Sequence, residues 1–417
     1  MTSPRRVTLV LCTGEHGVLG VLPPFEVGRP YWQETDGVVA GALERYDLHL
    51  TVLRILHASE QSPPGGDVTY LAEADPADAG RAGALVSAWS GPDPLADHPL
   101  RMPWARPGGP AADVGWALAV LAAAGRTPAG PPEQMRTWNL SSLWRLPATD
   151  GAGRAADAWL KVVPRFFAHE GLVLERLQRT GAVPALLARD TGPDGSGRVL
   201  LDAVPGEDFY GAPAERVAGF ARTLARIQAG CAGDVDALAA AGVPDRRDPA
   251  LLVAEATRLV DLVATGDGGA GQLAPAEVEA ARRLVDALPD RLAREAACGV
   301  PESLVHGDFH PGNVRGAAGR WRVLDWGDSY LGSPAVDVVT AGNGLDAAGR
   351  QQVLEAAAAE YGPDVDLLGA ADAARPVSPL RGALAWQRFL DAIEPDEWPY
   401  HEGDPAAGLR DALAAFH

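Results

Sequence analysis

"SLVHGDFHPGNVRGAAGRWRVLDWGDSYLGSPAVDVV", residues 303–339, is the stretch of this 417-residue chain that most constrains its fold. Within it, "HGDFHPGN" has the composition of a loop between apolar runs, and it presents Asp308 and, five residues later, Asn313. "WRVLDWGD" has the pattern of a strand that ends at Asp325. A carboxylate to receive a hydroxyl proton, with an amide oxygen and a second carboxylate for a hard cation, is what phosphoryl transfer requires. The stretch therefore predicts a phosphoryl-transfer site that binds Mg²⁺.

A second interpretation of the same stretch is a transition-metal site. His306, Asp308 and His310 occupy alternate positions, so on a strand they would share one face and could ligate a metal. Pro311 and Gly312 interrupt such a strand, and no further His or Cys follows at close range. The pattern favours the loop.

The order and spacing of these residues resemble a known family. His306-Gly307-Asp308 with Asn313, followed by Asp325-Trp326-Gly327, is similar to the catalytic loop and metal-binding turn of the aminoglycoside phosphotransferase and choline kinase superfamily, relatives of protein kinases. The resemblance covers about residues 133–417. It implies an α+β, bilobal protein-kinase-like fold, with Asp308 as the catalytic residue and Asn313 and Asp325 as ligands of Mg²⁺.

Lys161, in "AWLKVV" (158–163), is the only lysine among the 36 Lys and Arg residues of the chain. A drift toward Arg, Ala, Gly and Pro codons would remove lysines wherever arginine serves equally well, so the remaining one indicates a requirement that arginine does not meet. The resemblance implies a phosphate-binding lysine on the third strand of a small lobe, paired with a helix glutamate. Lys161 matches that lysine; Glu170 matches the glutamate best, with Glu175 as the alternative.

The resemblance also implies where a nucleotide binds, with ATP expected and GTP as an alternative. The turn "NLSS" (139–142) would place the hydroxyls and backbone N–H groups of Ser141 and Ser142 over the phosphates, although a plain turn explains it equally well. Asp202 to Val204 would offer backbone groups to adenine at the hinge between the lobes. The chain departs from the family pattern here, because this nucleotide loop is poor in glycine.

Two further residues have expected structural roles. Asp337, in "GSPAVDVV", resembles the family's "GDPxxDL" aspartate, which braces the catalytic loop, although Ser333 stands where the family has Asp. His306 is expected to bond within the loop and not to act as a base. Because Lys161, Asp308 and Asp325 are all present, the pattern favours an active enzyme over a pseudokinase.

Composition and punctuation divide the chain into four regions. The expected regions are residues 1–92, an N-terminal α+β domain; 93–132, a linker with a short helix at 111–125; 133–204, a kinase-like N-lobe; and 205–417, a helical C-lobe. The C-lobe pattern predicts helices over 213–230, 248–264 and 274–296.

The N-terminal domain, residues 1–92, is expected to contain short strands and one helix. Strands are predicted at 7–12 and 17–22, joined as a hairpin, and at 50–57 and 67–74, with a helix within 31–47. The order of these elements is faintly similar to a Nudix fold, but the run of glutamates that binds metal there is missing. We therefore expect this domain to be non-catalytic.

Composition also restricts the partners. The formal net charge of −19 argues against a nucleic-acid partner, because phosphate binding depends on clustered Lys and Arg. No apolar run approaches the roughly 20 residues of a membrane helix, and the N-terminus does not have the pattern of a signal peptide, so a cytoplasmic protein is expected. The three cysteines lack CxxC spacing and are expected to fill the core. Nothing indicates an oligomeric state.

Several phosphoryl acceptors are compatible with the sequence. Residues 389–409, "FLDAIEPDEWPYHEGDPAAGL", carry six acidic residues and no Lys or Arg. Carboxylates beside Trp398 and Tyr400 would suit a cationic, amine-bearing substrate, and a solvated acidic loop is an equally good explanation. A hydroxylated small molecule is expected as the acceptor: an aminoglycoside, another antibiotic or a nucleoside. A peptide serine or threonine, and a nucleotide-binding scaffold without activity, are the alternatives.

Overall fold

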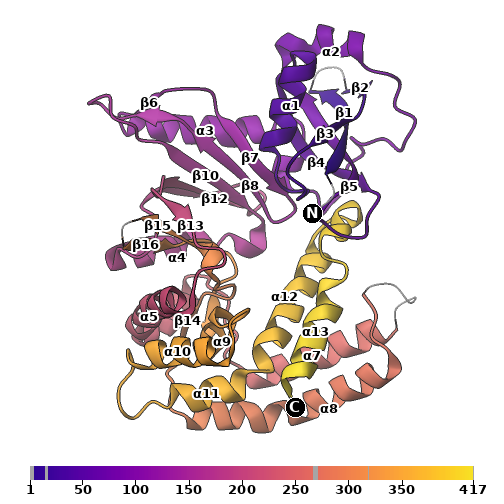
Figure 1. The fold of residues 1–417 in the computed structure, drawn as a ribbon. Helices are drawn as coiled ribbons and strands as arrows, with labels where there is room; N and C mark the ends of the chain where they lie inside the picture. The colour runs from indigo at the N-terminus through magenta and orange to yellow at the C-terminus, as the bar shows by residue number, and fades with distance from the viewer. Residues whose placement is uncertain (1–3, 15–16, 266–270, 318, 417) are drawn as a thin grey trace. The chain divides into compact units, whose positions relative to one another are not determined.

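The chain divides into two units, each built from segments that lie far apart in the sequence. The structure is a computed structural model that describes residues 4–14, 17–265, 271–317 and 319–416 (Figure 1). Unit 1 consists of residues 1–168, 186–203 and 389–402, and unit 2 consists of residues 169–185, 204–388 and 403–417. Within the described ranges, no helix is both long and apolar enough to cross a membrane.

A five-stranded mixed sheet forms the N-terminal part of unit 1. Its strands and the two helices that follow them in the chain are β1 Arg5–Thr13, β2 Gly17–Val21, β3 Phe25–Val27, α1 Asp36–Tyr46, β4 Leu50–Ala58, β5 Gly66–Ala74 and α2 Ala79–Leu85. Four strands lie in the order β2-β1-β5-β4, and β3 pairs with β1. The expected hairpin is confirmed by the antiparallel pairing of β1 with β2, whereas β1 and β5 run parallel.

A second, antiparallel sheet forms the rest of unit 1. The elements of this part are α3 Gly109–Ala123, β6 Thr127–Pro128, β7 Glu133–Trp138, β8 Ser141–Leu146, β9 Ala148–Thr149, β10 Ala158–Val163, β11 Leu186–Thr191 and β12 Gly197–Asp202. The strand order is β11-β12-β10-β8-β7, and β6 pairs separately with β9. α3 lies along one face of the sheet (Figure 1), where its apolar side chains share a core with those of β8 and β10. This arrangement confirms the strand pattern expected from residue 133 and the short helix before it.

Direct hydrogen bonds join the two sheets of unit 1. The buried side chain of Gln134 in β7 completes the backbone pairing of Val52 in β4: Val52 N donates to Gln134 Oε1 at 2.9 Å, and Gln134 Nε2 donates to Val52 O at 2.7 Å. Thr35 N also donates to the carbonyl of Met135. This pairing explains why the helix expected within residues 31–47 begins only at Asp36, because the residues before it bond to β7.

The acidic segment, residues 389–402, packs within unit 1, where two of its carboxylates, those of Glu394 and Glu397, are buried. The carboxylate of Glu394 is buried and accepts two hydrogen bonds from Arg101, at 3.1 and 2.8 Å. Buried Arg54 donates to Asp396 at 3.1 Å. Tyr400 lies in the core of the first sheet, with its ring 5.6 Å from that of Trp32. Part of this segment is therefore buried against arginines of the same unit, whereas Asp396 and Trp398 are exposed, and the binding of an amine there stays a prediction.

Glu397, in the same segment, provides a test of this packing. Burial and the neighbouring Glu394 carboxylate raise the pKa of Glu397 to about 8. A glutamate in the unfolded chain has a pKa of about 4.3. Between these two pKa values, the folded state therefore holds the proton of Glu397 more tightly than the unfolded state does. This tighter proton binding stabilises the folded state, and its contribution is fully present below the pKa of Glu397 in the unfolded chain. The contribution is lost as the pH rises through the pKa in the folded state, and the free energy of unfolding falls by at most about 1.4 kcal/mol per pH unit.

We therefore expect Glu397→Gln to flatten the fall in stability between pH 5 and pH 9. Thermal unfolding at several pH values measures it, with Glu402→Gln, an exposed position of the same segment, as the matched control. Parallel pH profiles for wild type and Glu397→Gln would show that this carboxyl is not held protonated by the fold.

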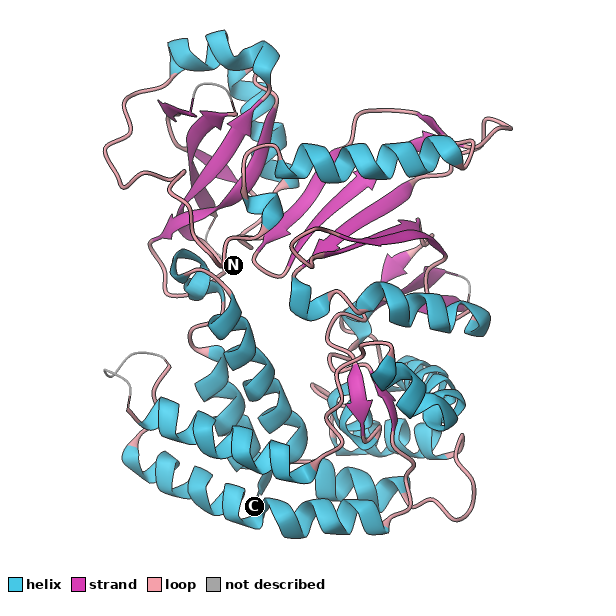
Figure 2. Cartoon of the chain, turned by 180° about the vertical axis from the view of Figure 1, so that it is seen from behind, coloured by secondary structure: helices cyan, strands magenta, loops and turns pink. Residues whose placement is uncertain are grey.

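Unit 2 is mostly helical. Its elements are α4 Glu170–Leu177, β13 Glu207–Asp208, α5 Ala214–Cys231, α6 Val235–Ala240, α7 Pro249–Ala264, α8 Pro275–Ala297, β14 Ser303–Val305, β15 Val314–Ala317, β16 Arg320–Val323, β17 Tyr330–Gly332, α9 Ala335–Ala341, α10 Ala347–Ala358, α11 Leu367–Ala374, α12 Val377–Ala392 and α13 Asp404–Phe416; the last residues of α12 belong to unit 1. α7 and α8 pack side by side and share a core with α12 and α13 (Figure 2). The three predicted helices are confirmed by α5, α7 and α8. Two small sheets, β13-β15-β16 and β14-β17, flank the loops of the candidate active site.

Candidate active site

The loop between β14 and β15 brings Asp308 and Asn313 together in unit 2. Asn313 Nδ2 donates to the backbone carbonyl of Asp308 at 2.9 Å and to its Oδ2 at 3.1 Å. The Asp308 side chain is 52% exposed, so its other oxygen can reach a ligand. The short 3₁₀ turn Pro311–Asn313 makes this contact, because it returns the chain toward Asp308 five residues on.

His306 fixes the loop and does not act as a metal ligand. Its Nε2 donates to the carbonyl of Leu324 at 2.8 Å, and its Nδ1 accepts from the backbone N–H of Asp308 at 3.3 Å. The ring is buried against Trp326, with centroids 4.7 Å apart. Both ring nitrogens are therefore used within the protein, which confirms the expected structural role and removes the strand-face metal site.

Asp337 braces the loop from below, as expected from the sequence. Its carboxylate is buried in α9 and accepts from the backbone N–H groups of His306 at 2.6 Å and Gly307 at 3.0 Å, and from Gln228 Nε2 at 2.7 Å. Burial raises the pKa of Asp337, and these donors oppose the shift. The carboxylate fixes the backbone from which Asp308 projects.

Asp325 lies at a strained turn directly after β16. Its φ of 59° is in the left-handed region that residues other than glycine seldom adopt. Trp326 next to it is fully buried, and its backbone N–H donates to Glu170 Oε1 at 3.2 Å. Glu170 is itself buried at the start of α4, so this glutamate helps to hold the 325–327 turn, a role that the sequence did not suggest.

His310 is the residue of the loop that sequence reasoning left without a role. Its Nδ1 accepts from Gly312 N at 3.0 Å, which leaves the proton on Nε2, 3.6 Å from Asp308 Oδ2. The neighbouring Asp308 carboxylate raises the pKa of His310 above its ordinary value. The only sequence signal was its place two residues after Asp308. The geometry makes it a polar neighbour of that carboxylate.

Ser141 and Ser142, expected in a turn over the nucleotide phosphates, belong to a strand instead, and their contact with phosphates stays a prediction. The turn consists of residues 139 and 140, and Ser141 and Ser142 already belong to β8. Both are buried, and their hydroxyls accept from the indole N–H groups of Trp138 and Trp144, each at 3.0 Å. A buried indole N–H requires a hydrogen-bond acceptor, and the two serine hydroxyls provide it.

Lys161 and the hinge residues are placed by the second sheet. Lys161 lies in β10, opposite Val199 of β12 and Leu143 of β8. Asp202 ends β12, and its carboxylate pairs with Arg126 at 2.6 Å. The carbonyl of Val204 accepts from Arg315 Nε at 3.0 Å. The Asp202 side chain and the Val204 carbonyl therefore already have protein partners, and their binding of adenine stays a prediction.

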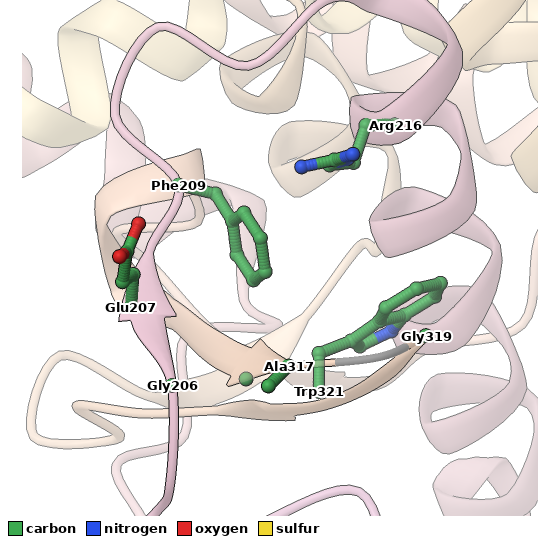
Figure 3. A pocket seen from close by; sticks show the side chains of 8 residues that line it. Gly206, Glu207, Phe209, Arg216, Ala317, Gly319 and Trp321 are labelled. Atoms are coloured by element: carbon green, nitrogen blue, oxygen red, sulfur yellow. The ribbon is translucent and has the colours of Figure 1, made fainter.

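A pocket of about 480 Å³ opens elsewhere on unit 2. Figure 3 shows it between the hairpin of β15 and β16, the residues around β13, and α5. Its lining residues are Gly206, Glu207, Phe209, Arg216, Gly316, Ala317, Gly319 and Trp321. None of the predicted catalytic or metal-binding residues is among them, so we assign it no part in the chemistry.

Comparison with known proteins identifies the family. A model of the phosphotransferase enzyme family matches residues 149–376, which is more than half of the chain. No curated protein matches.

Among solved structures, the GDP complex of wild-type aminoglycoside 2'-phosphotransferase-IIIa is similar at 14% identity and a TM-score of 0.52, over 73% of this chain and 99% of that one. Macrolide 2'-phosphotransferase MphH from Brachybacterium faecium is 20% identical, with a TM-score of 0.48, over 72% and 96%. The first similarity and the family match confirm the expected α+β, protein-kinase-like fold. The chain belongs to the phosphotransferase enzyme family.

Proposed function

We propose that this protein transfers the γ-phosphoryl group of ATP to a hydroxyl of a small molecule, with Mg²⁺ as the metal. The observation that carries the proposal is the pairing of Asp308 with Asn313 on a loop that His306 and Asp337 hold in place. A half-exposed carboxylate fixed in this way can orient an acceptor hydroxyl and receive its proton.

The residues present fit Mg²⁺. The amide nitrogen of Asn313 is directed at Asp308, so its oxygen is turned away from that carboxylate and can serve as a ligand. Asp325, in the turn that follows β16, would supply a second oxygen donor. Oxygen donors are what Mg²⁺ prefers, and when bound it would neutralise the charge of the nucleotide phosphates.

In this mechanism, the chain's own residues mainly position and stabilise charge. Asp308 orients the acceptor hydroxyl and takes its proton, and Lys161 contributes an ammonium to the α and β phosphates. Glu170 and the brace around Asp337 keep the turn and the loop in place. The presence of Asp308, Asn313 and Asp325 together favours an enzyme over a nucleotide-binding scaffold.

Nucleotide binding tests the proposal directly. A ligand present at 100 times its Kd stabilises the folded protein by about 2.7 kcal/mol, so ATP with Mg²⁺ should raise the Tm by several degrees, and ATP alone by much less. Asp325→Asn should abolish the difference between the two conditions, whereas Asp372→Asn, an exposed site on α11, should not. GTP in place of ATP determines the nucleotide preference.

An ATP-consumption screen over hydroxylated amines, hydroxy acids, nucleosides and serine- or threonine-containing peptides identifies the acceptor class. A metal-independent response to ATP, or consumption only with peptides, would contradict the proposal in this form.

A further inference from the structure

Three arginines gather around one buried tyrosine in unit 2. The guanidinium carbons of Arg246 and Arg381 lie 5.9 and 5.4 Å from the ring centroid of Tyr330. Arg388 joins them through Glu255: Nη1 of Arg246 and Nη1 of Arg388 lie 3.6 and 3.5 Å from the same oxygen of that carboxylate. We call Arg246, Arg381, Arg388 and Tyr330 the arginine cluster.

The arginine cluster is attached to the base of the catalytic loop. Tyr330 in β17 pairs with Val305 in β14, the residue that precedes His306. The backbone of Asp328 packs directly against Gly307, leaving no room for a side chain there. Arg246 N donates to the carbonyl of Leu331 at 3.0 Å, which fixes the loop before α7 to β17. The cluster is therefore connected through β17 and β14 to the backbone that positions Asp308.

Burial disfavours the charged forms of two arginines of the cluster, Arg246 and Arg388. Burial lowers the pKa of Arg246, and the attraction of Glu255 only partly opposes this. Burial and the neighbouring Arg246 lower the pKa of Arg388 to about 10. The Asp328 carboxylate attracts both Arg246 and Arg388. The Glu295 carboxylate attracts Arg381. A half-buried cation whose charged form is disfavoured gains from an additional anion.

Two buried polar atoms in the cluster point independently to a ligand. Among the residues that the structure describes, neither the Tyr330 hydroxyl nor Arg381 Nε has a hydrogen-bond partner. The Tyr330 side chain is more than nine-tenths buried, and burial raises the pKa of its hydroxyl to about 12, so it remains a neutral donor. A buried donor without an acceptor costs free energy, which an oxyanion bound beside it would recover.

We propose that the arginine cluster binds an oxyanion, a carboxylate or a phosphate, carried by the phosphoryl acceptor. The inference rests on the proposed function, and it names the substrate class: a hydroxylated acid or phosphate ester whose anionic group docks at the cluster while its hydroxyl meets Asp308. Guanidinium groups recognise both anions through paired N–H donors.

Tyr330→Phe gives the sharpest test, because it removes a hydroxyl that has no partner in the described protein. The variant should fold with unchanged or slightly higher Tm, because no protein hydrogen bond is lost. Its affinity for inorganic phosphate or acetate, measured calorimetrically on the full nucleotide-free chain against chloride at equal ionic strength, should fall by about 10-fold. Arg388→Lys keeps the charge but loses the planar fork, and a similar loss is expected. Arg375→Met, at an exposed site on the same unit, is the matched control.

The two anions distinguish the substrate sources, because preference for acetate indicates a hydroxy acid and preference for phosphate a phosphate ester. With an acceptor from the screen, Tyr330→Phe should raise KM for the anionic compound and leave KM for its neutral amide or dephosphorylated analogue unchanged.

Wild-type protein that binds neither anion, or a Tyr330→Phe variant with undiminished affinity, would overturn the inference. Failure of the proposed function would look different: anion binding would persist, and Asp308→Asn would retain full turnover.

Discussion

Asp308→Asn is expected to lower kcat by about 10²- to 10⁴-fold, the usual contribution of a positioned general base. The amide keeps the size of the side chain and can still bond to Asn313, so the loop should retain its form. The amide cannot, however, take the proton of the substrate hydroxyl as the carboxylate does. The stabilisation of the variant by ATP and Mg²⁺ should therefore match that of wild type, because Asp308 is not expected to contact the nucleotide.

The measurement is steady-state phosphoryl transfer, together with thermal shift by nucleotide on the same preparations. Asp372→Asn makes the same chemical change at an exposed position of unit 2 and should leave both quantities unchanged. Turnover of Asp308→Asn within about threefold of wild type would remove Asp308 from the chemistry. A loss of both turnover and nucleotide stabilisation would instead point to a collapsed loop.

The parts of this site that sequence could predict are those set by short-range spacing. The separation of Asp308 from Asn313 is a single turn of chain, so the residues alone indicate that they meet, and the structure has them hydrogen-bonded. Asp337 was expected to brace the loop from its place in "GSPAVDVV", and it bonds to two successive backbone N–H groups there. The first contact is local and depends little on how distant elements pack, whereas the Asp337 contacts span 31 and 30 residues and were expected from the family resemblance.

The parts that sequence could not predict depend on partners from far along the chain. The carboxylate of Glu394 resembles a solvated charge in its own segment, and only the packing of unit 1 places Arg101 against it. Ser141 and Ser142 resemble turn residues, and their case is different, because their partners Trp138 and Trp144 lie only three and two residues away and the burial of the indoles is what the sequence does not show. The arginine cluster is assembled from a loop and a helix more than 130 residues apart.

Lysine and arginine differ in this chain in a way that bears on Lys161. Buried ion pairs in this chain use arginine, because its planar guanidinium can donate two hydrogen bonds to one carboxylate. Arg101 does so with Glu394. Lys161 stands in β10 between Leu160 and Val162, both fully buried, so its flexible stem leaves a tightly packed strand. A compact ammonium on such a stem suits a point contact with phosphate oxygens, and a guanidinium is wider and planar.

Lys161→Arg is accordingly expected to lower kcat/KM for ATP by about 10²-fold or more, the scale of losing one charge-stabilising donor in an active site. Lys161→Met, which removes the charge and keeps the length, should lose at least as much. Arg154→Lys, on an exposed loop of the same unit, controls for the exchange of the two residue types and should behave as wild type. If Lys161→Arg keeps near-normal activity while Lys161→Met does not, the site requires only a positive charge. If both remain active, the lone lysine of this chain has survived for a reason other than phosphate binding.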